Sequence, residues 1–230
     1  MNLPDPFRAL VIGATGAIGA AFVALLETDP RCAAVVSLHR HSQPAIDFDD
    51  EASIAKAAAE LAQQAPFHLI INAAGKLHTP DFMPEKKLGD LNYAQMEETF
   101  RTNAFGPALV LRHFSALLER EGSAIVTLSA KVGSIEDNRL GGWYSYRASK
   151  AALNMFIKTA SIELKRTKSN TVVIAMHPGT VSSKLSAPYR GAEIGRTPDV
   201  AAAEMFAVIT QQTSAASGSF LSYSGEVLPW

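Results

Sequence analysis

The strongest constraint on this chain is an alternation of short apolar runs with longer helical stretches from one end to the other. The sequence predicts strands at residues 7–12, 33–38, 67–71, 124–129, 171–176 and 218–223, with a weak additional run at 45–48. It predicts helices at residues 17–27, 50–64, 91–120, 143–168 and 199–210. Such alternation is typical of βαβ units, and uninterrupted apolar runs indicate strands covered by helices on both faces. We therefore expect one α/β domain over residues 1–230, with a doubly wound parallel sheet of about seven strands.

Composition narrows the classes of function. The formal net charge is −1, so no overall field attracts nucleic acid or an acidic membrane. Cys32 is the single cysteine, which excludes an internal disulfide and a CxxC-type metal site, and we predict no metal. No apolar run approaches the ~18 residues that a membrane span needs, and the opening residues MNLPDPFR lack the apolar core of a signal peptide. We expect a cytoplasmic protein.

A glycine-containing loop follows the first predicted strand and opens the first predicted helix. Glycines at this point allow a tight turn and close backbone approach to a ligand, and free N–H groups at the helix start attract an anion. The loop therefore predicts a dinucleotide pyrophosphate site, the alternative being a turn that only packs the helix. The predicted contacts are Gly13, Thr15, Gly16, Ala17 and Ile18.

The end of the second predicted strand bears on the choice of cofactor. An acidic residue there would bind the ribose 2′-hydroxyl of NAD, whereas a 2′-phosphate requires a cation. The chain has His39 and Arg40 at this point and no acid, which favours NADP(H). A solvated surface arginine is the alternative.

Tyr146 and Lys150 stand four residues apart near the start of a predicted helix, so both lie on one helical face. A free phenol has a pKa of roughly 10, and a nearby ammonium favours the phenolate. Tyr146 is thus a candidate acid–base residue beside a redox cofactor.

Together these residues resemble the short-chain dehydrogenase/reductase superfamily, with its Rossmann-type fold, over essentially the whole chain. Residues 132–154 and 225–230 resemble its C-factor and carbonyl-reductase-like subgroup. The resemblance implies that Tyr146 is the acid–base residue, that Lys150 binds the nicotinamide ribose, and that Asn103 holds a water linking Lys150 to solvent. It further implies adenine contacts from Asp47 and Phe48, support of the sheet and the adenosine ribose by Asn72, Ala73, Ala74 and Gly75, and nicotinamide contacts from Pro178, Gly179, Thr180 and Val181.

One departure from the family pattern concerns its catalytic serine. The position three residues before Gly133 normally carries this serine, and here it is Ala130. Ser129 and Ser134 are the two hydroxyls within reach, and we assign the role to Ser129, although strand alternation would point it to the other side.

The resulting functional hypothesis is an NAD(P)(H)-dependent oxidoreductase that interconverts a carbonyl compound and an alcohol. The alternative is a non-catalytic or signalling NAD(P)-binding protein of the C-factor type. Residues 182–198 are long for a bare connection and are a candidate substrate lid. The resemblance also implies a homodimer or homotetramer that pairs through the two long helices.

Overall fold

The computed structural model describes residues 3–230, so that Met1 and Asn2 lie outside the described part of the chain. Its centre is a parallel sheet of six strands in the order β2-β1-β3-β4-β5-β6. The strands are β1 (Phe7–Ile12), β2 (Cys32–Leu38), β3 (Leu69–Asn72), β4 (Ser123–Leu128), β5 (Thr171–His177) and β6 (Phe220–Ser222). All five pairings between neighbouring strands are parallel.

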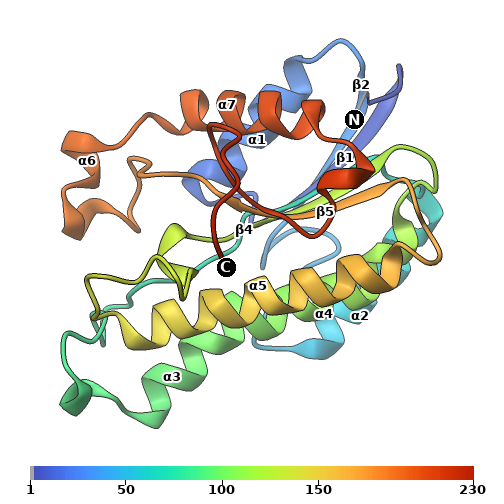
Figure 1. Cartoon of the computed structure of the whole chain (residues 1–230). Helices are drawn as coiled ribbons and strands as arrows, with labels where there is room; N and C mark the ends of the chain where they lie inside the picture. Colours follow the sequence, from blue (N-terminus) through green and yellow to red (C-terminus); the bar gives the residue numbers. More distant parts are fainter. Residues whose placement is uncertain (1–2) are drawn as a thin grey trace.

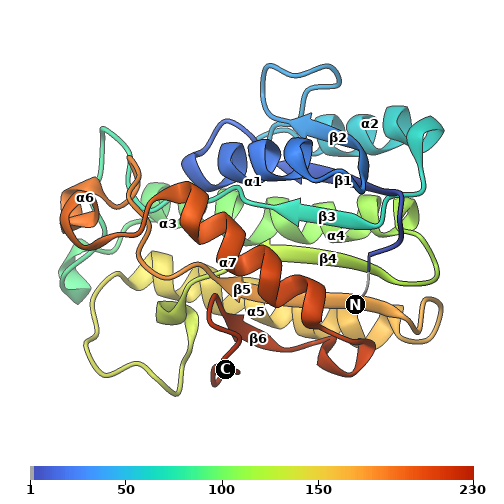
Figure 2. The ribbon, with the colours of Figure 1, turned by 90° about the horizontal axis from the view of Figure 1, so that it is seen from above.

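Helices cover both faces of the sheet and give three layers (Figures 1 and 2). One face carries α1 (Ala17–Thr28) and α7 (Pro198–Gln211), and the other carries α2 (Glu51–Leu61), α4 (Gly106–Phe114) and α5 (Tyr144–Leu164). Alternation along each strand divides the core: Leu10 and Ile12 pack in one apolar cluster, and Ala9 and Val11 in the other. The predicted doubly wound α/β fold is confirmed.

The sheet has six strands rather than about seven, because the weak run at residues 45–48 forms no strand. A parallel crossover needs a dozen or more residues, usually including a helix. Residues 39–50 connect β2 directly to α2 and leave no room for such a unit. The run is instead fixed by a hydrogen bond from the Ile46 N–H to the His39 carbonyl, 3.1 Å.

The predicted helix over residues 91–120 is interrupted. It consists of α3 (Tyr93–Phe100), a π-helical turn (Arg101–Phe105), α4 and a short 3₁₀ turn (Ser115–Leu117). Asn103 lies inside the π turn, where the wider turn frees backbone groups from the regular ladder. The regular α-helix is therefore interrupted at Asn103.

Residues 182–198 are folded back on the domain. They include a 3₁₀ turn (Ala187–Tyr189) and α6 (Gly191–Ile194). A bridge between Val181 and Arg196 closes the base of the segment. Within residues 3–230, no helix has the length and apolar character that a membrane crossing requires.

The strand order reverses direction at β1, because the chain first moves to β2 and then returns past β1 to β3. In open α/β sheets, ligands bind outside the carboxyl ends of the strands at such a switch point. The loops after β1 and β3 meet there, which places the glycine loop beside Asn72 and Gly75.

Candidate active site

Two cavities lie along the carboxyl ends of the strands. The larger has a volume of about 620 Å³ and is lined by Tyr146 and Lys150, and the smaller has a volume of about 280 Å³ and is lined by Gly13 and Gly16. Both are lined by the same three residues after β3, which are Ala73, Ala74 and Gly75. A long ligand with two parts can therefore bind with one part in each cavity and extend across this turn.

The glycine loop is shaped by close backbone contacts. Gly13 has φ +78°, and a Cβ at this position would lie 2.7 Å from the Ala74 backbone nitrogen. A Cβ at Gly19 would collide with the Gly13 carbonyl oxygen. The N-terminus of α1 follows at Gly16 with no side-chain cap, so its first N–H groups remain available to an anion. The loop thus fits a pyrophosphate.

The smaller cavity brings together most residues predicted for the adenosine end. Its lining includes Thr15, His39, Arg40, Asp47 and Phe48. The Phe48 ring packs where a Cβ on Gly106 would stand, which fixes the ring at the cavity wall. Arg40 is exposed and, within residues 3–230, has no ion pair or hydrogen bond that would occupy its guanidinium.

Two of the predicted cofactor residues line neither cavity. Ala17 lies in the first turn of α1, and Asn72 is fully buried at the end of β3. The Asn72 side-chain oxygen accepts a hydrogen bond from the Ala74 N–H at 3.2 Å, so Asn72 shapes the turn from below. The larger cavity does contain Ile18, Pro178, Gly179, Thr180 and Val181.

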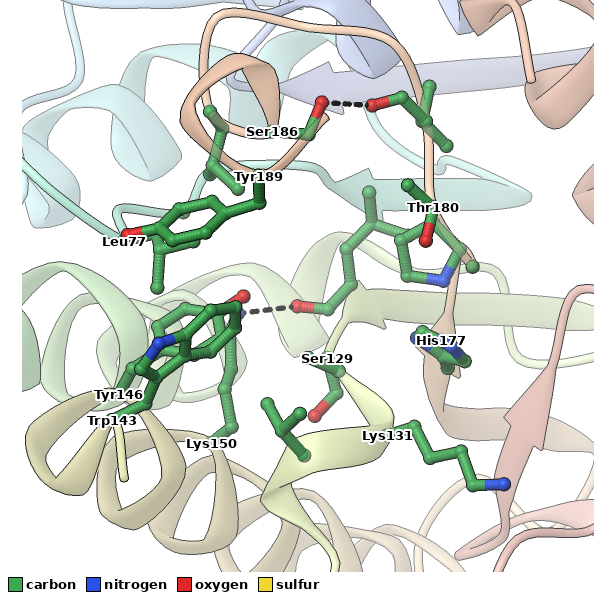
Figure 3. A pocket seen from close by; sticks show the side chains of 18 of the residues that line it. Leu77, Ser129, Lys131, Trp143, Tyr146, Lys150, His177, Thr180, Ser186 and Tyr189 are labelled. Atoms are coloured by element: carbon green, nitrogen blue, oxygen red, sulfur yellow. Dashed lines mark hydrogen bonds between the residues drawn. The ribbon is translucent and has the colours of Figure 1, made fainter. Parts of the chain in front are cut away.

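Tyr146 and Lys150 are both buried on the cavity-facing side of α5 (Figure 3). The Lys150 Nζ lies 5.9 Å from the centre of the Tyr146 ring and donates to the Leu128 carbonyl at 2.9 Å. Within the described residues the Tyr146 hydroxyl makes no hydrogen bond, which leaves it available to a ligand. The edge of the Trp143 ring packs on Tyr146, with ring centres 6.1 Å apart.

Burial controls the protonation of this pair. It raises the pKa of the Tyr146 phenol above its ordinary value and lowers the pKa of the Lys150 ammonium to about 8. The expected lowering of the Tyr146 pKa is therefore not provided by Lys150 alone, because desolvation outweighs the ammonium at this separation. A neutral phenol facing a cavity is a proton donor.

Asn103 connects the π turn to this region. Its side chain accepts from the Lys76 N–H at 2.8 Å and donates to the Lys76 carbonyl at 2.7 Å. It also donates to the Ser149 hydroxyl at 3.2 Å. A Cβ on Gly75 would be 3.7 Å from both the Asn103 side-chain oxygen and the Lys150 Nζ, so the three residues meet.

The two candidate serines are already engaged with the protein. The Ser129 hydroxyl donates to Asn154 on α5 at 2.7 Å, and the Ser134 hydroxyl donates to the Trp230 carbonyl at 3.1 Å. Binding a substrate oxygen would require Ser129 to give up its bond to Asn154. Ser129 lines the larger cavity together with Tyr146 and Lys150, whereas Ser134 does not, so the assignment of Ser129 as substrate donor stays a prediction.

Sequence reasoning missed Glu85, which fixes the start of α5. Its buried carboxylate accepts from the Ser145 N–H at 3.1 Å and from the Ser145 hydroxyl, and its carbonyl accepts from the Trp143 N–H at 2.5 Å. A carboxylate at a helix N-terminus is stabilised by the unpaired N–H groups and the helix dipole. Glu85 stands 60 residues before Ser145, so no local pattern signals the contact.

Arg196 was also missed, and it braces the turn after β5. Its guanidinium donates to the Pro178 carbonyl and to Glu204, and it lies 3.4 Å from the centre of the Tyr223 ring. Gly179 has φ +68°, and a Cβ there would collide with this guanidinium. The turn lining the larger cavity is thereby held from behind.

Comparisons with known proteins agree with this arrangement. Residues 8–193 match the family described as short chain dehydrogenase. A 1-hydroxy-2-glutathionyl-2-methyl-3-butene dehydrogenase of Rhodococcus sp. (strain AD45) is 30% identical over 188 residues, which cover 82% of this chain and 80% of that protein. The C-signal protein of Myxococcus xanthus is 37% identical over 147 residues, covering 62% and 83% respectively.

Among solved structures, an NADPH-bound carbonyl reductase from chicken fatty liver has a TM-score of 0.84 and 26% identity, covering 99% of this chain and all of that one. Carbonyl reductase Sniffer of D. melanogaster has the same TM-score of 0.84, and the match covers 98% of this chain and all of the Sniffer chain. At 20% identity it supports the fold alone. The family match extends from β1 into α6, and the predicted pair of Tyr146 and Lys150 lies in one cavity. The chain therefore belongs to the short-chain dehydrogenase family and is an NAD(P)-dependent oxidoreductase.

Proposed function

We propose that this protein interconverts a small carbonyl compound and the corresponding alcohol, with NADP(H) as the preferred cofactor. The observation that carries the proposal is the single cavity of about 620 Å³ in which the unbonded Tyr146 hydroxyl lies near the Lys150 ammonium. The names of the Rhodococcus relative, a dehydrogenase of a hydroxy compound, and of the chicken carbonyl reductase support this class of reaction.

The cofactor fits the residues present. The Gly13 loop would hold the pyrophosphate, Asp47 and Phe48 the adenine, and Pro178 to Val181 the nicotinamide. When bound, the nicotinamide supplies or accepts the hydride.

The remaining chemistry belongs to side chains of this protein. The neutral Tyr146 phenol donates a proton to the substrate oxygen during reduction and takes it back during oxidation. Lys150 holds the cofactor ribose and places a positive charge beside the phenolate that forms, which favours that charged state. The Asn103 side chain meets Lys150 at Gly75 and is hydrogen-bonded to the Lys76 backbone, and we propose that these polar groups form a route by which a water reaches Lys150.

The substrate side of the cavity is largely apolar and partly covered. Leu185, Tyr189 and Ile194 line it from the 182–198 segment, and the Tyr189 and Trp143 rings lie 4.8 Å apart. The His78 Nε2–H donates a hydrogen bond to the Leu185 carbonyl at 3.2 Å. We propose that this segment is a substrate lid that excludes water during proton transfer.

Cofactor choice is tested at Arg40. Replacing Arg40 with Asp should raise the Kd for NADPH by about 30-fold or more and change the Kd for NADH by less than about threefold, because the guanidinium pairs only with a 2′-phosphate. Isothermal titration of both cofactors measures this. Arg166→Asp carries the same charge change in the exposed turn that follows α5 and should change neither value. Equal weakening of both cofactors by Arg40→Asp would contradict the assignment.

We also propose self-association, as a dimer or tetramer, through the outer face of α4 and α5. Apolar side chains are exposed along this face, namely Met155, Phe156 and Ile162. Exposed apolar surface of this kind typically marks an interface. Phe156→Glu should shift the sedimentation coefficient toward that of a monomer, whereas Ile135→Glu, at an exposed apolar residue elsewhere, should not. A wild-type protein that sediments as a monomer would contradict the proposal.

A second candidate function is cofactor binding without catalysis, in a signalling role. The similarity to the C-signal protein and the alanine at position 130 favour it. The buried Tyr146 and Lys150 favour catalysis, because a sensor needs neither an acid nor a desolvated ammonium.

A further inference from the structure

His177 is a partly buried, polar cavity residue that the proposed mechanism does not use. It ends β5 next to Ser129, whose N–H donates to the Met176 carbonyl at 2.8 Å. Its imidazole lines the same cavity as Tyr146, and its Nδ1 is buried without a hydrogen-bond partner among the described residues. A buried polar atom left unpaired is destabilising, so a bound partner that forms a hydrogen bond with Nδ1 would be favoured.

The cavity has two chemically distinct sides. Figure 3 shows His177 and Lys131 on one side and Trp143, Tyr146 and Tyr189 on the other. The aromatic side is the apolar wall that continues into the lid. A substrate whose reacting carbonyl meets Tyr146 would therefore direct any substituent that points away from the aromatic wall toward His177.

The electrostatic surroundings of His177 favour an anion. Burial, together with the positive charges of Lys131 and Arg196, lowers the pKa of the imidazole to about 4, so the ring is neutral at neutral pH. A neutral imidazole has one N–H to donate. Lys131 lies 3.8 Å from Asp137 and is about half exposed, so its ammonium can turn to a second acceptor. Arg139 also lines the cavity. Lys131, Arg139 and Asp137 together carry two positive charges and one negative charge, which gives a net charge of +1.

We propose that His177 and Lys131 form a subsite for a carboxylate on the substrate, so that the preferred substrates are carbonyl compounds that also carry a carboxylate. This inference rests on the proposed function, because the reacting carbonyl must be held at Tyr146. The imidazole N–H donates to one carboxylate oxygen, and the Lys131 ammonium neutralises its charge.

Two aldehydes of matched size test the subsite. With NADPH, wild-type protein should reduce 4-carboxybenzaldehyde with a kcat/KM at least about tenfold above that for 4-methylbenzaldehyde, since a hydrogen bond to a charged group contributes this much or more. His177→Leu should lower the value for the carboxylate at least about ten times more than the value for the methyl compound. Lys131→Met should act in the same direction, with an effect that weakens as salt is added.

Binding gives a second readout that needs no turnover. Titration of 4-carboxybenzyl alcohol into wild-type protein with NADPH should give a Kd that rises about tenfold or more in His177→Leu. His177→Gln keeps a side-chain N–H and should retain part of the preference, which guards against a variant that fails to fold. An equal effect of His177→Leu on both aldehydes, or a wild type without preference, would overturn the subsite. If wild type reduces neither aldehyde yet binds the carboxylate through His177, the subsite stands and the proposed function fails.

Discussion

Replacing Tyr146 with Phe should lower kcat for carbonyl reduction by about 10³-fold, within the range that a positioned general acid contributes. The ring would keep its packing against Trp143 and its burial, so the free energy of unfolding should change little. The loss follows because the substrate oxygen no longer receives a proton from the cavity wall. Steady-state kinetics with NADPH and a panel of aldehydes measures it, with NADPH Kd as the check on cofactor binding.

Tyr144→Phe is the matched control, since it removes a phenol from the same helical turn but outside the cavity lining. It should retain most of the activity. A Tyr146→Phe variant with more than about a tenth of wild-type kcat would contradict the proton-donor role. If wild type and Tyr146→Phe were equally inert while both bound NADPH, the signalling candidate would be favoured instead.

Replacing Gly13 with Ala should destabilise the protein by about 2–4 kcal/mol and weaken NADPH binding at least tenfold. Two effects combine at this residue. The left-handed backbone, with φ +78°, disfavours any Cβ, and the added carbon would lie 2.7 Å from the Ala74 nitrogen. Relief requires the loops after β1 and β3 to separate, which widens the pyrophosphate site. Thermal unfolding and NADPH titration measure the two effects.

Gly89→Ala is the control for this change, because a Cβ at Gly89 meets no atom within 4 Å and the position has an ordinary φ. It should leave the melting temperature and the NADPH affinity near their wild-type values. A Gly13→Ala variant as stable as Gly89→Ala, with unaltered NADPH affinity, would show that the loop does not need this close contact.

The sheet was predictable because its central strands are buried on both faces. Strands such as β4 and β5 consist of apolar runs that only a helix-covered parallel sheet explains. The weak run at 45–48 was wrongly included, since apolar content alone does not reveal that the connection is too short for a crossover. The break in the 91–120 helix falls at Asn103, which is a poor helix former within an otherwise helical pattern.

The site was predictable where its residues lie close together in the sequence. Tyr146 and Lys150 share one helical face, and the glycine loop is a continuous segment. Contacts between distant segments carry no such signal, as for Glu85 with Ser145 and Arg196 with Pro178. His177 had a usable signal, because it is the last residue of a strand whose carboxyl end faces the ligand site. The hydrogen bond from Ser129 to Asn154 could not be predicted, because the two residues are 25 positions apart in the sequence.

The most direct test of the account follows a deuterium atom from cofactor to product. NADPH deuterated at the transferring position of the nicotinamide is mixed with wild-type protein and 4-carboxybenzaldehyde, and the alcohol is analysed by mass spectrometry. The account predicts one deuterium on the carbinol carbon with wild type, and a rate of incorporation about 10³-fold lower with Tyr146→Phe. NADPH that binds while no aldehyde or ketone in a broad panel acquires deuterium would contradict it.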